Sequence, residues 1–92
     1  MLLNISTKIK KLNPNAIIPT KGSIEAAGYD LYACIDKSIS IKPQETVKIG
    51  TGLAVEIPAS FWLGIFARSG LATKKGLRPA NCVGVIDSDY RG

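Results

Sequence analysis

The last nine residues of the chain, GVIDSDYRG at 84–92, hold the side chains best suited to chemistry. Asp87 and Asp89 are carboxylates, and a carboxylate within one hydrogen bond of a water molecule can act as its general base. Tyr90 adds a flat aromatic surface on which a sugar could stack. The alternative is a polar turn, in which Asp87 and Ser88 hydrogen-bond their own backbone. This stretch alone does not decide between the two.

A second candidate is ARSGLA at 67–72, which follows the longest apolar run. The guanidinium of Arg68 offers a planar set of donors that matches phosphate oxygens. Ser69 adds a hydroxyl donor, and Gly70 lets backbone N–H groups come close to an anion. Together they would make a compact anion-binding site. Taken by itself, the segment is better explained as an ordinary strand exit with an arginine on the surface.

A third candidate is Asp30, in AAGYDLYA at 26–33. It stands between Tyr29 and Leu31 in a run that otherwise reads as a strand, where aspartate is disfavoured. It is either a solvent-facing residue after a glycine bend or a carboxylate that orders the water around a metal ion. The residues around it leave both interpretations open.

Composition narrows the classes of chemistry. The chain has no histidine, which excludes Ser-His-Asp catalysis, Cys-His catalysis and zinc held by histidine. The formal charge of +5, from 12 Lys and Arg against 7 Asp and Glu, suits an anionic partner such as a nucleotide. The lysines are scattered, so most are better explained as solvated surface. Lys74, Lys75 and Arg78 follow the second candidate closely and could draw in a polyphosphate.

Cys34 and Cys82 are too far apart in the sequence for a CxxC site. We expect buried free thiols in a reducing compartment, and a disulfide between them stays open. The run FWLGIFA at 61–67 is far shorter than the roughly 20 residues of a spanning helix. The start of the sequence lacks the pattern of a signal peptide. The sequence therefore predicts a soluble protein in the cytoplasm, or in the nucleus if the source is eukaryotic or viral.

Short strands would position these residues. Apolar residues alternate with period two in SISIKP (38–43), TVKIG (46–50) and LAVEIP (53–58), which predicts half-buried strands. FWLGIF (61–66) reads as a more fully buried strand, and CVGVI (82–86) as another. Turn residues at 42–45, 50–52 and 58–60 separate them, and SGLATKKG (69–76) fits one short helical turn. We expect a single all-β domain over 1–92, a sandwich or barrel-like roll of marginal stability.

In this order and spacing, the three candidates resemble the motifs of the trimeric deoxyuridine triphosphatases (dUTPases). AGYDLYA resembles the first motif, RSGLA the second and NCVGVIDSDYRG the third, and the resemblance runs from about residue 16 to the last residue. It implies a β-roll (β-clip) fold, a homotrimer with shared active sites, and Mg²⁺-assisted hydrolysis of dUTP to dUMP and pyrophosphate. Neither nucleic acid nor a membrane is expected as a partner.

The resemblance also implies roles for residues of the third motif. Asp87 would orient and activate the water that attacks the α-phosphorus. Asn81 would contact the uracil or that water. The backbone groups of Val85 and Ile86 would read the edge of the uracil. Tyr90 would pack against the deoxyribose and leave no room for a 2′-hydroxyl.

For the other two motifs, the resemblance implies contacts to phosphate and metal. Arg68, Ser69 and Gly70 would hold phosphate oxygens in the site of a neighbouring subunit. Asp30 would act on Mg²⁺ indirectly, through water, which suits an ion that usually keeps several waters.

The sequence departs from the family pattern in two places. Ala67 stands where the second motif usually begins with proline, a mild change in backbone stiffness. The family also continues past the third motif, with further strands and a flexible glycine-rich tail that closes over the substrate. We therefore expect this chain to be a piece of a longer protein with little activity, because lid closure completes such sites.

Three other functions stay open. A dCTP deaminase-related enzyme shares the fold, although IDSDYRG resembles the dUTPase motif more closely. A non-catalytic short form would bind dUTP or a protein partner without turnover. A nucleic-acid-binding β module is favoured only by the net charge, since the sequence lacks the aromatic platform that such modules use.

Overall fold

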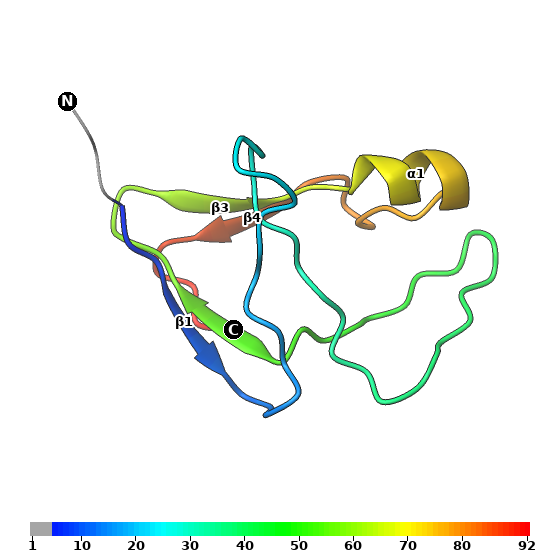
Figure 1. Ribbon diagram of the computed structural model, residues 1–92, viewed down its shortest axis with the longest axis horizontal. Coiled ribbons are helices and arrows are strands. Elements are labelled where there is room, and N and C mark those ends of the chain that lie inside the picture. The colour runs from blue at the N-terminus through cyan, green and yellow to red at the C-terminus, as the bar shows by residue number, and fades with distance from the viewer. Residues whose placement is uncertain (1–4) are drawn as a thin grey trace. The chain divides into compact units, whose positions relative to one another are not determined.

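A computed structural model describes residues 5–92 of the chain (Figure 1). Its elements are four strands and one helix: β1 (Lys8–Lys11), β2 (Leu53–Glu56), β3 (Trp62–Ile65), α1 (Ser69–Lys75) and β4 (Gly84–Asp87). The strands form two two-stranded sheets, β1 with β2 and β3 with β4. The prediction of an all-β chain built from short strands is confirmed.

The chain divides into two compact parts. The first, here the C-terminal part, comprises residues 5–8 and 55–92. The second, here the middle part, comprises Ile9–Ala54. The single-domain organisation expected for 1–92 stays a prediction, and each part is described by itself.

The centre of the C-terminal part is the antiparallel pair of β3 and β4, which lie side by side in Figure 1. Trp62 pairs with Asp87 at one end, and Ile65 pairs with Gly84 at the other. Side chains alternate across a strand, so Leu63 and Ile86 are half-buried on one face while Trp62 is 57% exposed on the other. The expectation of a more fully buried strand at 61–66 is wrong, because a two-stranded sheet covers only one face of this run.

The helix α1 follows β3 closely. Arg68 is its N-cap residue, with extended backbone and no side-chain hydrogen bond to the helix, and Gly76 ends it in the left-handed conformation at φ 68°. Leucine, alanine and lysine favour helix, and Lys74 and Lys75 in the last turn suit the negative end of the helix dipole. The helix has seven residues, about two turns rather than the single turn expected.

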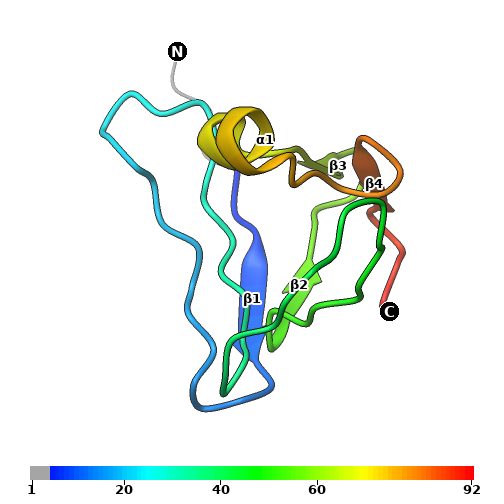
Figure 2. The ribbon, with the colours of Figure 1, turned by 90° about the vertical axis from the view of Figure 1, so that its right-hand side faces the viewer.

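The middle part is mostly irregular. Figure 2 draws the chain between β1 and β2 without helix or strand arrows. Backbone bonds between residues distant in the sequence tie it at three places: Leu12 N–H donates to Gly52 O (2.8 Å), Cys34 N–H donates to Gly50 O (2.9 Å), and Thr20 and Asp30 form an isolated antiparallel bridge. The predicted turn at 42–45 is confirmed, since Glu45 N–H donates to Lys42 O (3.0 Å).

The strands predicted at 38–43 and 46–50 are absent from the described residues. Their apolar residues do alternate, but the backbone of 38–49 has no ladder partner within residues 5–92, and Ile39 and Ile49 are exposed. Alternation predicts which face of a strand would be buried, whereas the strand itself requires hydrogen bonds from a neighbour. Residues 38–50 show the alternation, but no neighbouring strand within residues 5–92 provides the hydrogen bonds.

Within residues 5–92, Ala16 and Ile57 are the only buried hydrophobic residues, while nineteen large hydrophobic residues are exposed. This small core agrees with the marginal stability expected from the length. Both cysteines are free, as predicted, but Cys82 is exposed and Cys34 is only half-buried, so the expectation of buried thiols is wrong. No helix in the described residues is long and apolar enough to cross a membrane.

Candidate functional site

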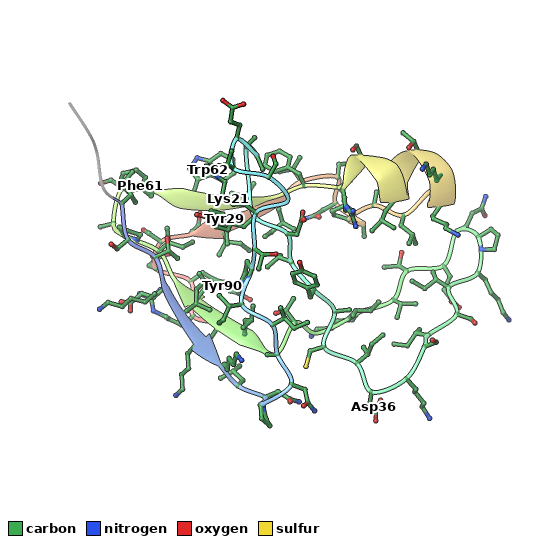
Figure 3. The ribbon with its side chains drawn as sticks, in the orientation of Figure 1. Lys21, Tyr29, Asp36, Phe61, Trp62 and Tyr90 are labelled. Atoms are coloured by element: carbon green, nitrogen blue, oxygen red, sulfur yellow. The ribbon has the colours of Figure 1, made fainter. Side chains whose placement is uncertain are left out.

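Asp87 and Tyr90 lie at the end of β4. Asp87 is the last residue of the strand, and its carboxylate is exposed to solvent. The Tyr90 N–H donates to the carbonyl oxygen of Asp87 (3.1 Å), which closes a turn over 87–90. Tyr90 is 55% exposed, and Figure 3 labels it with Trp62, the residue opposite Asp87 in the strand register. The stretch is therefore a polar turn in which the side chains of Asp87 and Tyr90 are both accessible to solvent.

Arg91 holds this turn from one side. Its Nη1 donates to the carbonyl oxygens of Ser88 (2.8 Å) and Tyr90 (2.9 Å), and its Nη2 donates to Oε1 of Glu56 (3.4 Å). Neither Arg91 nor Glu56 is among the site residues predicted from the sequence. Arg91 lies within GVIDSDYRG at 84–92, and this position next to Tyr90 was a signal in the sequence that could have identified it. Its partner lies 35 residues away, and nothing in one sequence points to that pairing.

Val85 and Ile86 occupy the middle of β4. Val85 pairs with Gly64 and is 61% exposed, while Ile86 pairs with Leu63 and is half-buried. Within the described residues β4 pairs only with β3, so the backbone groups along its other edge have no strand partner. The predicted contact between backbone groups of this strand and a base requires N–H and C=O groups that are not already bonded to another strand.

Gly64 lies between two aromatic residues, Trp62 in β3 and Phe66 just after the strand. A Cβ atom at this position would come within 2.6 Å of the Phe66 ring and 3.0 Å of the Trp62 ring. Glycine therefore lets the two rings approach the strand from either side, across from Val85. The exposed face next to Asp87 is accordingly aromatic and apolar.

Asn81 lies in the turn that leads into β4. The Cys82 N–H donates to Pro79 O (3.0 Å), and the Val83 N–H donates to Asn81 O (2.7 Å). Cys82 has φ 68°, which is uncommon for a residue other than glycine. The side chain of Asn81 is exposed, and its amide makes no hydrogen bond within residues 5–92. It is free to contact a ligand.

Arg68, Ser69 and Gly70 lie where β3 leads into α1, and all three are exposed. The Arg68 guanidinium has no carboxylate within 4.0 Å in the described part of the chain. A Cβ atom at Gly70 would meet no atom within 4 Å. The segment therefore presents an unpaired cation beside open backbone. The Ser69 carbonyl oxygen is occupied, because it accepts the Thr73 hydroxyl (2.9 Å).

The strand register separates this segment from Asp87. Asp87 pairs with Trp62 at one end of the β3–β4 pair, and Arg68 follows Ile65 at the other end. Three residues of strand span about 10 Å, and Arg68 lies three residues beyond that point. Within one chain, Asp87 and the segment of Arg68, Ser69 and Gly70 thus lie toward opposite ends of the β3–β4 pair.

Asp30 belongs to the middle part. Its N–H donates to Thr20 O (2.7 Å), and its carbonyl oxygen accepts the Thr20 N–H (3.4 Å). The neighbouring hydroxyls of Thr20 and Tyr32 hydrogen-bond each other (2.6 Å). Asp30 is half-buried, so it is neither a core residue nor a fully solvent-facing one. The backbone bridge explains how an aspartate fits in this extended run.

The described residues contain no group of three or more His, Cys, Asp and Glu side chains that could hold a metal ion. The carboxylates of Asp30 and Asp87 are hard oxygen donors, the type that a hydrated divalent cation prefers.

Comparison with known proteins identifies the relatives of this chain. The dUTPase family profile matches residues 14–92. The deoxyuridine 5′-triphosphate nucleotidohydrolase of Nautilia profundicola is 53% identical over 85 residues, covering 92% of this chain and 58% of that protein. The enzyme of the same name from Desulfitobacterium hafniense is 55% identical over 76 residues, covering 82% of this chain and 50% of its own length. The chain thus spans about half the length of these curated relatives.

Among solved structures, the dUTPase of Staphylococcus bacteriophage 80alpha superposes with a TM-score of 0.72 at 29% sequence identity. The superposition covers 95% of this chain and 54% of the phage protein. The predicted β-roll (β-clip) fold is thereby confirmed.

Proposed function

The chain belongs to the dUTPase family, and from this premise we propose that it contributes to hydrolysis of dUTP to dUMP and pyrophosphate. The observation that carries the proposal is the exposed side chain of Asp87 at the end of β4, in a residue whose main-chain carbonyl oxygen accepts the Tyr90 N–H and so closes the turn that holds Tyr90. An accessible carboxylate can reach a water molecule, which a buried one could not.

In this proposal, Asp87 accepts a proton from water while the water oxygen attacks the α-phosphorus. A new bond forms between that oxygen and the α-phosphorus, and the bond from the α-phosphorus to the bridging oxygen breaks. Pyrophosphate leaves with the bonding electrons, and dUMP retains the oxygen from water. Positioning and charge neutralisation supply most of the rate in phosphoryl transfer.

Recognition of the nucleoside is assigned to the same strand and turn. Backbone donors and acceptors in the stretch of Val85 and Ile86 would contact the uracil from the unpaired edge of β4, to which one of these two successive residues directs its groups. The free amide of Asn81 adds a side-chain contact. A base with the wrong pattern would leave these groups unpaired, which is costly. The exposed ring of Tyr90 packs against the deoxyribose and excludes a 2′-hydroxyl.

Phosphate binding is assigned to Arg68, Ser69 and Gly70 of a neighbouring copy in a homotrimer. The strand register supports this assignment, because it carries Arg68 and Asp87 at opposite ends of the β3–β4 pair. Exposed apolar residues such as Trp62 and Phe66 are consistent with association between copies. A chain that assembles poorly would have incomplete sites, so we expect slow turnover by the isolated 92 residues.

The cation in this proposal is Mg²⁺, which neutralises the triphosphate when bound. Asp30 is the residue proposed to act toward it, through ordered water, since the described residues offer no cage of protein ligands. A location in the cytoplasm or nucleus stays a prediction.

Product analysis in ¹⁸O-labelled water tests the function. Incubation with dUTP and Mg²⁺ should give dUMP that carries the label and pyrophosphate that does not. Label in the pyrophosphate would exclude attack at the α-phosphorus. Release of ammonia from dCTP would instead indicate the deaminase-related group, and binding of dUTP without any product would indicate a non-catalytic form.

A further inference from the structure

We propose that Arg91, anchored by Glu56, is a positioning residue that fixes Tyr90 and thereby sets the discrimination between deoxyribose and ribose. The inference rests on the proposed function, because it assigns Tyr90 to the sugar. It adds two residues, Arg91 and Glu56, that the proposed function leaves without a role.

The backbone of Tyr90 is held on both sides while its ring is exposed. Its N–H donates to the Asp87 carbonyl oxygen (3.1 Å), and its own carbonyl oxygen accepts Nη1 of Arg91 (2.9 Å). The hydroxyl lies against Gly92, where even a Cβ atom would overlap it. With 55% of the residue exposed, much of the side chain lies in solvent. The position of the ring therefore depends on the backbone of residues 87–92, including Gly92, against which it lies.

Arg91 is suited to hold that backbone. One nitrogen of its guanidinium bridges the carbonyl oxygens of Ser88 (2.8 Å) and Tyr90 (2.9 Å), and the other reaches Glu56 (3.4 Å). The guanidinium is planar and carries several donors in fixed directions, so the three acceptors become fixed relative to one another. A lysine ammonium is a single point of charge and cannot reproduce this arrangement.

Glu56, at the end of β2, is the anchor outside the turn. Its carboxylate lies 3.4 Å from Arg91 and 4.0 Å from Lys8, and both ion pairs are substantially exposed. Exposed ion pairs contribute little by themselves, whereas hydrogen bonds from a charged donor are stronger than neutral ones. The expected order of importance is therefore Arg91 first, Glu56 second and Lys8 last.

The functional consequence follows from steric exclusion. A ring rejects a 2′-hydroxyl only if it cannot move away by the width of an oxygen atom. Loosening the turn would weaken binding of dUMP and would admit UMP more readily. The ratio of the Kd for UMP to the Kd for dUMP should therefore fall. A residue that only supported the fold would weaken both complexes alike and leave this ratio unchanged.

The test compares the wild-type chain with Arg91→Ala, Arg91→Lys, Glu56→Gln and the matched control Lys8→Ala. Titrations with dUMP and UMP follow the fluorescence of Trp62, the single tryptophan, which pairs with Asp87. We expect the ratio to fall about tenfold in Arg91→Ala and less in Arg91→Lys and Glu56→Gln. It should not change in Lys8→Ala. An unchanged ratio in Arg91→Ala would overturn the inference.

Amide hydrogen exchange gives a readout that needs no nucleotide. In Arg91→Ala the Tyr90 amide should exchange about tenfold faster, while amides in β3 keep their wild-type rates. Unaltered exchange at Tyr90 would also overturn the inference. If the wild-type chain bound neither nucleotide, the proposed function would fail for this chain, and the exchange rates would still decide whether Arg91 holds the turn. Should Arg91→Ala not fold, Arg91→Lys and Glu56→Gln supply both readouts.

Discussion

The two parts of the chain differ in how their backbones are held. In the C-terminal part, β3 and β4 pair along their length, and the turns at 79–82 and 87–90 are closed by backbone hydrogen bonds. In the middle part, a long irregular segment is tied at a few points, such as Thr20 to Asp30 and Cys34 to Gly50. All candidate residues except Asp30 lie in the C-terminal part. In our proposal, most of the chemistry therefore lies on the part whose backbone is held by strand pairing, as positioning requires.

The largest effect on the reaction rate is expected from a substitution of Asp87, in the C-terminal part. Asp87→Asn removes the proposed general base and should lower pyrophosphate release from dUTP by about 10²–10⁴-fold. Asp36→Asn is the matched control, an exposed aspartate of the middle part, and should leave the rate unchanged. Equal losses in both variants would refute the assignment of the base to the C-terminal part. Initial rates at saturating dUTP, with circular dichroism to check folding, make the measurement.

The second-largest effect on the reaction rate is expected from a substitution of Arg68, at the opposite end of the β3–β4 pair. Arg68→Ala should reduce the rate about 10²-fold, because it removes a charge-assisted contact to the phosphates. If sites are shared between copies, mixing Arg68→Ala with Asp87→Asn should restore activity, since roughly a quarter of the sites in a random mixture would then be intact. A mixture no more active than its components would argue that each chain forms its own site.

A smaller effect, on the free energy of unfolding, is expected when an alanine replaces one glycine in each part. Gly64→Ala places a Cβ atom 2.6 Å from the Phe66 ring and should lower the free energy of unfolding by about 1 kcal/mol. Gly28→Ala in the middle part meets nothing within 4 Å and should change it by less than about 0.5 kcal/mol. Urea unfolding of the two variants measures the difference. A larger loss at Gly28 would reverse the comparison.

The smallest effect on the free energy of unfolding is expected in the middle part, at the turn over 42–45. Glu45 accepts the Lys42 N–H through its side chain (3.2 Å) and donates its own N–H to the Lys42 carbonyl oxygen (3.0 Å). Glu45→Ala should cost about 0.5 kcal/mol of unfolding free energy. Glu25→Ala, an exposed glutamate of the same part, is the control and should cost nothing measurable. Indistinguishable urea midpoints for the two variants would show that this turn does not stabilise the middle part.

Local chemistry made several elements predictable from the sequence. The turn at 42–45 and the strands at 53–56, 62–65 and 84–87 follow from proline, glycine and alternating apolar residues. The strands predicted at 38–43 and 46–50 failed because alternation does not supply a hydrogen-bonding partner. The prediction that the strand at 61–66 is more fully buried was wrong for a related reason. Phe61 and Phe66 are apolar, but no other element covers them within residues 5–92, and both are exposed.

The roles of the candidate site residues stay predictions. The structure shows that Asp87 and Tyr90 are exposed, as those roles require. The contacts of Arg91 were not predictable, because they join carbonyl oxygens of a turn to a glutamate 35 residues away. The opposite placement of Arg68 and Asp87 also required the register of β3 and β4. Spacing along a chain does not specify either relation.

The most direct test of the central claim is pyrophosphate release by the 92-residue chain with Mg²⁺, measured in parallel on dUTP, UTP, dCTP and dTTP. We predict slow release from dUTP, lost in Asp87→Asn, and no release above background from the other three nucleotides. Equal release from dUTP and UTP, or no release from dUTP at any chain concentration, would contradict this prediction.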